Sequence, residues 1–183
     1  MDTLVPVVFS QDSNICAIGT PDFNGYYMYN IYGVKVHEEV IQAEQLFLAN
    51  DSSYVTYSRN FSENGMAQGT TLKFYDKFGN SVLVDLMFNN EAFVSYLSNG
   101  NMFIISNKDG YNSWSRCGLA RFVILDDHYQ PIVNKIVAYR SEYVIPPSYD
   151  EERLEYTLPI KLIDGIVKYR IYDKNFDFLF ERE

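Results

Sequence analysis

The stretch Ala92–Ser106, which reads AFVSYLSNGNMFIIS, decides the fold class. It holds two runs of apolar and aromatic residues on either side of Ser98-Asn99-Gly100-Asn101. Such runs favour pleated strands, and an Asn-Gly pair can supply both positive φ angles of a type I′ turn. The stretch therefore predicts a β-hairpin closed by a type I′ turn.

Similar runs recur along the rest of the chain, separated by turns rich in Gly, Asn, Asp and Pro. They give about a dozen candidate strands at spacings of roughly 8 to 15 residues. The 16 Tyr and 13 Phe among 183 residues agree, because aromatic side chains fit half-buried strand surfaces. We expect an all-β (β-rich) fold, an antiparallel sandwich or partly closed barrel. We assign it to a single domain over residues 1–183, with a candidate subdivision near residues 141–153.

Two segments interrupt the strand pattern and predict one or two short helices. Glu38–Ala49 places its apolar residues at spacings of three and four and carries acids at its start, which suits a helix N-terminus. A second helix is predicted to begin near Ser148 or Asp150, directly after Pro146-Pro147.

Three predicted hairpins carry an aspartate at the entrance of the turn, namely Asp76, Asp126 and Asp173. In this place a carboxylate can accept hydrogen bonds from backbone N–H groups. The spacings are uneven, at about 50 residues, so we interpret the three as ordinary hairpins and not as a repeat architecture.

The segment Phe74–Asn80, FYDKFGN, lies in an acidic chain rich in Tyr and Asn. This style of hairpin resembles the β-sandwich modules of bacteriophage tail, baseplate and fibre proteins. The resemblance covers the three hairpins and carries over no functional residue. It implies a structural role in a phage virion, as a tail, collar or fibre adaptor component.

The charge balance argues against two classes of partner. Lys and Arg number 15 against 24 Asp and Glu, for a net charge of −9. Nucleic acid and anionic lipid both require clustered basic residues, so we expect neither a nucleic-acid nor a membrane partner. The first residues lack the basic start and apolar core of a secretory signal. We expect synthesis in the cytoplasm, which is compatible with incorporation into a virion.

Residues for nucleophilic catalysis are scarce, since the chain has two histidines. His128 follows Asp126-Asp127 in a predicted turn, and His37 precedes two glutamates, so both are interpreted as solvated. We therefore expect no enzyme, although a glycoside hydrolase built on a pair of carboxylates stays open, because two acids can meet only in the fold.

Metal and cofactor motifs are also missing from the sequence. Cys16 and Cys117 do not form a CxxC pair and are interpreted as buried free thiols. Asn107–Asn112 is a fragment of a calcium loop without its closing acid, and we interpret it as an Asp-Gly turn. We expect neither a metal nor a cofactor.

The segment Tyr26–Tyr32 is the strongest candidate for binding. In a strand, Tyr27, Tyr29 and Ile31 would share one face, with Tyr32 on the other. Both faces could be covered by the fold. Alternatively one face meets a partner subunit or stacks on a sugar ring, since Tyr is favoured at interfaces. The candidate binding residues are Tyr27, Tyr29, Tyr32, Trp114 and Arg116.

These observations favour a non-enzymatic structural or interaction protein of a homo-oligomeric assembly, whose partners are itself and other assembly proteins. The alternatives are a carbohydrate-binding module that takes a glycan, and a small inhibitor of a host protein. The C-terminal run Phe176–Phe180 would form an unprotected edge strand, and we expect the working assembly to cover it.

Overall fold

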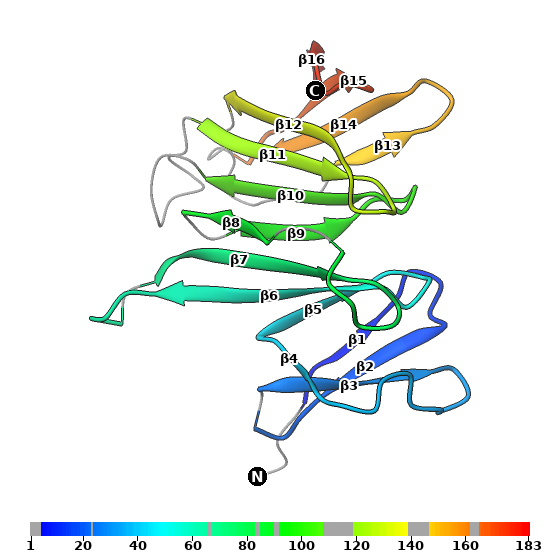
Figure 1. Cartoon of the computed structure of the whole chain (residues 1–183). Coiled ribbons are helices and arrows are strands. Elements are labelled where there is room, and N and C mark those ends of the chain that lie inside the picture. Colours follow the sequence, from blue (N-terminus) through cyan, green and yellow to red (C-terminus); the bar gives the residue numbers. More distant parts are fainter. Residues whose placement is uncertain are drawn as a thin grey trace. The chain divides into compact units, whose positions relative to one another are not determined.

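The computed structural model describes residues 5–22, 24–65, 67–82, 85–89, 92–107, 119–138, 147–161 and 165–183, and this part of the chain is all-β (Figure 1). The predicted fold class is confirmed. The strands are β1 Val7–Phe9, β2 Ile15–Gly19, β3 Gly25–Asn30, β4 Ile41–Gln42, β5 Gln45–Leu48, β6 Tyr54–Phe61, β7 Ala67–Tyr75, β8 Leu86–Phe88, β9 Ala92–Tyr96, β10 Met102–Asn107, β11 Leu119–Leu125, β12 Pro131–Ala138, β13 Ser148–Asp150, β14 Glu155–Lys161, β15 Val167–Asp173 and β16 Phe178–Arg182.

The strands form four antiparallel sheets of four strands each. The first sheet is β1-β2-β3-β4, the second β5-β6-β7-β8, the third β9-β10-β11-β12 and the fourth β13-β14-β15-β16. Strands that follow one another in sequence are neighbours in every sheet, so each sheet is a chain of local hairpins. Such pairing is the simplest that short antiparallel strands allow, because each turn brings the next strand alongside.

The chain divides into two compact units, Met1–Phe88 and Asn89–Glu183, and each contains two sheets. In the first unit the core lies between the first and second sheets and includes Met28 and Leu48. In the second it lies between the third and fourth sheets and includes Phe122 and Leu158. The sheets therefore pack face to face, as the sandwich prediction requires, and none closes into a barrel. The assignment to a single domain over residues 1–183 stays a prediction, as does the candidate subdivision near residues 141–153.

The same turn joins the third strand to the return segment in all four sheets. Its first residue is Asn30, Asp76, Asp126 or Asp173, and a side-chain oxygen of that residue accepts hydrogen bonds from the backbone N–H groups two and four residues later, at 2.7–3.0 Å. The backbone N–H of the first residue also bonds to the carbonyl of the fifth.

These four turns start 46, 50 and 47 residues apart along the sequence. Each belongs to one four-stranded sheet, so the fold does repeat, and the interpretation of unrelated hairpins was wrong. The fourth member was missed because Asn30 stands where the other turns have aspartate. Its amide oxygen accepts the same two hydrogen bonds as a carboxylate oxygen.

The helix expected over Glu38–Ala49 is wrong, because this segment forms β4 and β5. Ile41, Ala43, Leu46 and Leu48 are all buried in the core of the first unit. Their spacings of two and three residues suit two short strands that pair with β3 and β6. Helix propensity is a weak preference, and here the pairing with existing strands overrides it.

The second expected helix is wrong for a related reason. Asp150 does accept the backbone N–H groups of Glu152 and Arg153, at 3.0 Å each, as a helix cap would. The chain then reverses at Leu154, which has a φ of 55°, and β14 begins at the next residue. The acids after Pro147 therefore build a tight turn between β13 and β14.

The hairpin at Ser98–Asn101 is confirmed, but its turn type is not. Only Gly100 in this loop has a positive φ, at 85°, and its N–H donates to the Leu97 carbonyl. The N–H of Leu97 in turn bonds to the carbonyl of Asn101 at 2.8 Å. This is the three-residue loop with one left-handed residue, in place of a type I′ turn.

Candidate functional site

Within the described residues the first sheet is apolar on both faces, and only one of them packs into the core of its unit. We call the face opposite to the core the outer face of the first sheet. It consists of Val7, Phe9, Cys16, Ile18, Tyr27 and Tyr29. The strand register aligns them in two rows, one of Val7, Ile18 and Tyr27 and one of Phe9, Cys16 and Tyr29.

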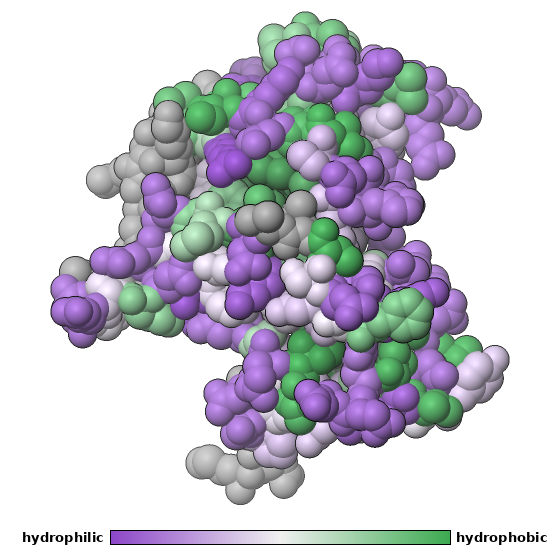
Figure 2. Space-filling model, in the orientation of Figure 1, coloured by the Kyte–Doolittle hydropathy of each residue, from purple (hydrophilic) through white to green (hydrophobic). Residues whose placement is uncertain are grey.

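This outer face remains open to solvent. Phe9 is 60% exposed and Val7 is 48% exposed, whereas Ala17 and Met28 on the opposite face are fully buried. No strand residue of the outer face carries a charge. Figure 2 shows that hydrophobic residues reach the surface among hydrophilic ones. An apolar sheet face of this kind is typical of a surface that another protein covers.

The alternation predicted for the segment Tyr26–Tyr32 holds within β3. It differs only at the end of the segment, beyond the strand. Tyr27 and Tyr29 point to the outer face and are half-buried, while Tyr26 and Met28 enter the core. The strand ends at Asn30, so Ile31 and Tyr32 lie in the following turn. Tyr32 is 84% exposed and does not belong to the face.

Two further groups complete the outer face. The Lys35 ammonium lies 4.8 Å from the centre of the Tyr27 ring and adds a positive charge at the rim. The free thiol of Cys16 lies on β2, between β1 and β3, and is half-buried, which corrects the expectation of a buried thiol. Cys117, Trp114 and Arg116 lie outside the described residues. Asn107 ends β10, and the rest of the candidate calcium segment is not described either.

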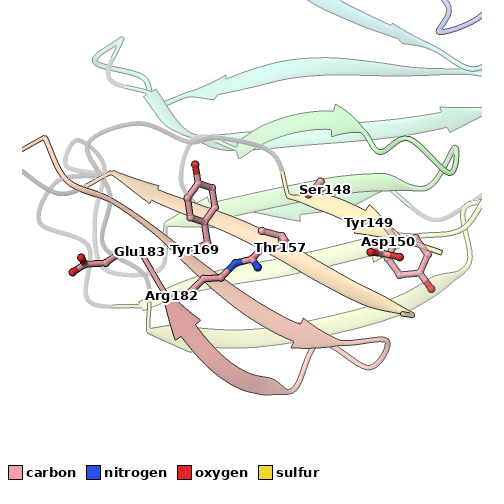
Figure 3. A pocket seen from close by; sticks show the side chains of 7 residues that line it. All are labelled: Ser148, Tyr149, Asp150, Thr157, Tyr169, Arg182 and Glu183. Carbon is pink, nitrogen blue, oxygen red and sulfur yellow. The ribbon is translucent and has the colours of Figure 1, made fainter. Parts of the chain in front are cut away.

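A second surface lies on the fourth sheet, on the face opposite to its core. We call this set the outer face of the fourth sheet: Ser148, Thr157, Pro159, Tyr169, Ile171, Phe180 and Arg182, of which Ile171 is buried, at 2% exposed. Phe180 is 48% exposed and Tyr169 is 36% exposed. Ser148, Thr157, Tyr169 and Arg182 line an open depression of about 610 Å³ on this face (Figure 3). Sequence reasoning missed this surface, although the alternation in β15 could have indicated it.

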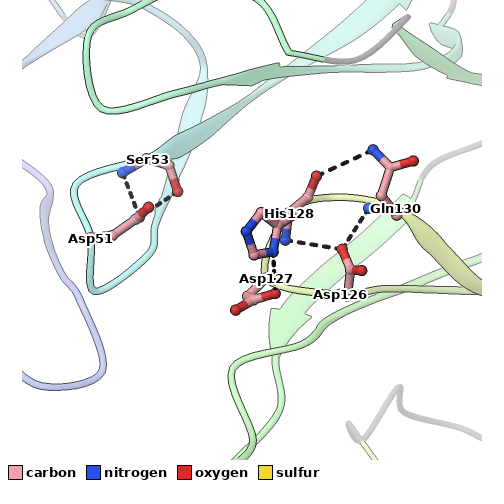
Figure 4. A network of polar contacts seen from close by, with 6 residues as sticks. All are labelled: Asp51, Ser53, Asp126, Asp127, His128 and Gln130. Atoms are coloured by element: carbon pink, nitrogen blue, oxygen red, sulfur yellow. Dashed lines mark hydrogen bonds and ion pairs between the residues drawn. The ribbon is translucent and has the colours of Figure 1, made fainter.

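The cluster Asp126, Asp127 and His128 has the donor types of a metal site, with ligand atoms within 4.8 Å of one another. It is built, however, from the repeated turn. The Asp126 carboxylate accepts the N–H groups of His128 and Gln130, at 2.9 and 2.7 Å (Figure 4). His128 Nδ1 lies 2.6 Å from Asp127, and both side chains are mostly exposed. Asp76 holds the same turn with no histidine nearby in sequence, so the turn explains the position of Asp126.

His37 is half-buried, whereas the sequence predicted a solvated side chain. Its ring packs edge-on against Tyr54 at 5.4 Å, and Tyr54 stacks on Tyr75 at 4.8 Å. The Nε2 atom is buried and has no hydrogen-bond partner among the described residues. Burial, aided by the neighbouring Tyr75, raises the pKa of Tyr54 to about 12. These three rings join the β3–β4 connection to the second sheet and serve packing.

Comparisons with known proteins bear on the fold alone. No family model and no curated protein matches the sequence. Among solved structures, Hsv2 of Kluyveromyces lactis with its loop 6CD replaced by a Gly-Ser linker matches 97% of this chain and 52% of its own, with 11% identity and a TM-score of 0.56. Dipeptidyl peptidase 4 of Porphyromonas gingivalis matches 97% of this chain and 32% of its own, with 10% identity and a TM-score of 0.55.

Both of these proteins are β-propellers. At such low identity the likeness shows the fold, in which each four-stranded antiparallel sheet corresponds to a propeller blade. The chain spans about half the length of the first of these structures and a third of the second. Within the described residues, no apolar helix reaches the length needed to cross a membrane.

Proposed function

We propose that this chain is a non-enzymatic structural or interaction protein that works in a homo-oligomeric assembly through the outer face of the first sheet. One observation carries the proposal: six aligned uncharged side chains on three paired strands, with Phe9 60% exposed. Burying one such side chain contributes about 1.5–3 kcal/mol, so several together can hold a complex.

The candidate catalytic groups support the non-enzymatic part of the proposal. His128 belongs to an exposed turn, and His37 belongs to an aromatic stack. The repeated aspartates Asp76, Asp126 and Asp173 accept backbone hydrogen bonds in turns, which gives these three carboxylates a structural role. A phage particle remains the proposed setting, supported by the resemblance of the hairpins; neither solved structure named above is a phage protein.

The native mass over a dilution series, measured by light scattering, tests the proposal. We expect the parent protein to be an oligomer and Phe9→Asp to be a monomer, because the charge would have to enter the apolar contact. The matched control is Phe78→Asp, since Phe78 is 75% exposed in the turn after β7. It should leave the mass unchanged. A monomeric parent, or an oligomer that Phe9→Asp leaves intact, would overturn the proposal.

A further inference from the structure

The open depression on the outer face of the fourth sheet gathers polar side chains from four strands. Ser148 and Thr157 are cross-strand partners on β13 and β14, and Tyr169 and Arg182 are cross-strand partners on β15 and β16. Directly opposed residues of an antiparallel pair carry their side chains on the same face and close together. The volume of about 610 Å³ falls within the roughly 300–1,000 Å³ of ligand sites. The strand register therefore places four polar groups around one hollow of ligand size (Figure 3).

Arg182 is the basic residue of this depression, and its charge is not balanced by an internal partner. Each of the other four arginines that the structure describes has a side-chain partner: Arg59 has Glu44, Arg121 has Asn134, Arg153 has Asp150 and Arg170 has Glu181. Within the described residues, the Arg182 guanidinium makes no hydrogen bond or ion pair. Arg182 thus keeps all its N–H donors for a group from outside the chain.

The two acids that line the depression do not supply the missing partner. Asp150 accepts the backbone N–H groups of Glu152 and Arg153 at 3.0 Å, and its carboxylate lies 3.8 Å from Arg153 Nε. The Glu183 side chain extends away from Arg182 in Figure 3. A guanidinium presents a planar fork of donors that matches a carboxylate with two parallel hydrogen bonds. The depression is therefore suited to a ligand that brings its own carboxylate.

The groups around Arg182 suit a sugar better than a peptide or a nucleic acid. Ser148, Thr157 and Tyr169 each carry a hydroxyl group with no hydrogen-bond partner in the described part of the chain, and a hydroxyl can both donate and accept. Tyr169 is 36% exposed, so its ring also offers a flat apolar surface. None of the described lining residues is aliphatic, as an apolar peptide anchor would require. A single cation in a chain of net charge −9 does not suit a phosphate backbone.

We propose that this depression binds a sugar residue that carries a carboxylate, such as a uronic or sialic acid of a glycan. The Arg182 guanidinium pairs with the carboxylate, the Tyr169 ring packs against the face of the sugar, and the hydroxyls of Ser148 and Thr157 bond to sugar hydroxyls. Because the depression is open, the bound residue can belong to a longer glycan. This site lies on a different sheet from the face used in the proposed function, so the inference goes beyond that function and does not rest on it.

A glycan array followed by titration calorimetry tests the inference. The array carries oligosaccharides that end in a uronic or sialic acid, each printed beside its carboxyl-reduced form. We expect the protein to retain acidic forms. In solution, the acidic oligosaccharide that is best retained should bind at least about tenfold more tightly than its reduced form, because reduction removes the charged partner of Arg182.

Variants of the lining residues locate the binding. Arg182→Ala should weaken binding of that oligosaccharide about tenfold or more, and Arg182→Lys should recover only part of it, because lysine keeps the charge without the fork. The matched control is Lys174→Ala, which removes one positive charge from an exposed turn of the same sheet and should leave the affinity unchanged. Tyr169→Ala should weaken binding about fivefold and Tyr169→Phe less, because phenylalanine keeps the ring. These side chains are exposed, so the circular dichroism spectra should match that of the parent.

The outcomes that would overturn the inference are specific. They are the absence of retention of every acidic glycan, equal binding of acidic and reduced forms, and equal losses in Arg182→Ala and Lys174→Ala. A glutamate-containing peptide that binds more tightly than the best acidic glycan would assign the depression to a peptide instead. Each of these outcomes leaves the proposed assembly standing, because that proposal is tested by the native mass of the parent and of Phe9→Asp.

Discussion

The turn that follows the third strand of each sheet is built with glycine in the unit Met1–Phe88 and with aromatic residues in the unit Asn89–Glu183. Its fourth residue has a positive φ in all four cases: 73° at Gly33, 84° at Gly79, 59° at Tyr129 and 61° at Phe176. A left-handed conformation suits glycine and costs other residues roughly 1–2 kcal/mol. In the second unit this conformational cost arises at two positions, Tyr129 and Phe176.

Burial explains the difference between the units. Tyr129 is 3% exposed and Phe176 is 1% exposed, whereas Gly33 lies at the surface with no atom near the position of a Cβ. Phe176 stacks on Tyr172 at 4.3 Å and lies 5.2 Å from the Phe122 ring, inside the core of its unit. Full burial of such a side chain contributes about 1.5–3 kcal/mol, which outweighs the strain. The same turn therefore serves as a surface reversal at Gly33 and as a core plug at Phe176.

The largest expected effect is at this plug. Phe176→Ala should lower the free energy of unfolding by about 3–5 kcal/mol, because it leaves a cavity among Phe122, Tyr156 and Tyr172. Urea denaturation monitored by circular dichroism measures the loss.

Two further variants sharpen that measurement. Phe178→Ala is the control, since Phe178 is 57% exposed, and it should cost less than about 1 kcal/mol. Phe176→Gly removes the same ring and also relieves the strain, so it should be about 1 kcal/mol more stable than Phe176→Ala. The reverse order would show that the backbone at Phe176 stores no strain.

A smaller effect is expected at the corresponding glycine. Gly33→Ala should lower the free energy of unfolding by about 1 kcal/mol, because a Cβ there meets no atom within 4 Å and only the backbone conformation is strained. Gly33→Asn should cost less, since asparagine tolerates the left-handed region. The same denaturation assay applies, and equal losses for the two variants would contradict this account.

The smallest effect is expected at the first residue of the turn, whose protonation makes the stability of the fold depend on pH. Hydrogen bonds from Asn80 lower the pKa of Asp76, and the backbone N–H of Asp177 is the main cause that lowers the pKa of Asp173. Both groups are ionised in the folded and unfolded states above the ordinary value of 3.8, so their stabilisation is complete there. As the pH falls through 3.8 and below, the unfolded chain takes up protons first and the stabilisation is lost.

Asn30, the first residue of the corresponding turn in the first sheet, suggests a variant that tests this pH dependence. Asn30 makes the same two hydrogen bonds without titrating, so Asp76→Asn with Asp173→Asn should flatten the fall of the melting temperature between about pH 5 and pH 3. Scanning calorimetry at several pH values measures the slope. A double variant as sensitive to acid as the parent would show that other carboxylates dominate.

Local features of the sequence determined the fold class and the turns. The Asn-Gly hairpin after Leu97 and the aspartates at positions 76, 126 and 173 were predictable, because a turn depends on the φ angles and side-chain bonds of a few adjacent residues. The alternation of Tyr26 to Tyr29 likewise placed Tyr27 and Tyr29 on one face, because successive side chains of a strand point to opposite sides.

The tertiary structure decided what depends on partners distant in sequence. Glu38–Ala49 has a helical spacing, but pairing with β3 and β6 makes it two strands. The sequence predicted that Phe176 belongs to an exposed edge strand. In the structure it instead packs against the rings of Phe122 and Tyr156 in the core. Whether the alternating apolar face of a strand is covered depends on which sheet packs on it. That is why Met28 is buried while Phe9 remains exposed.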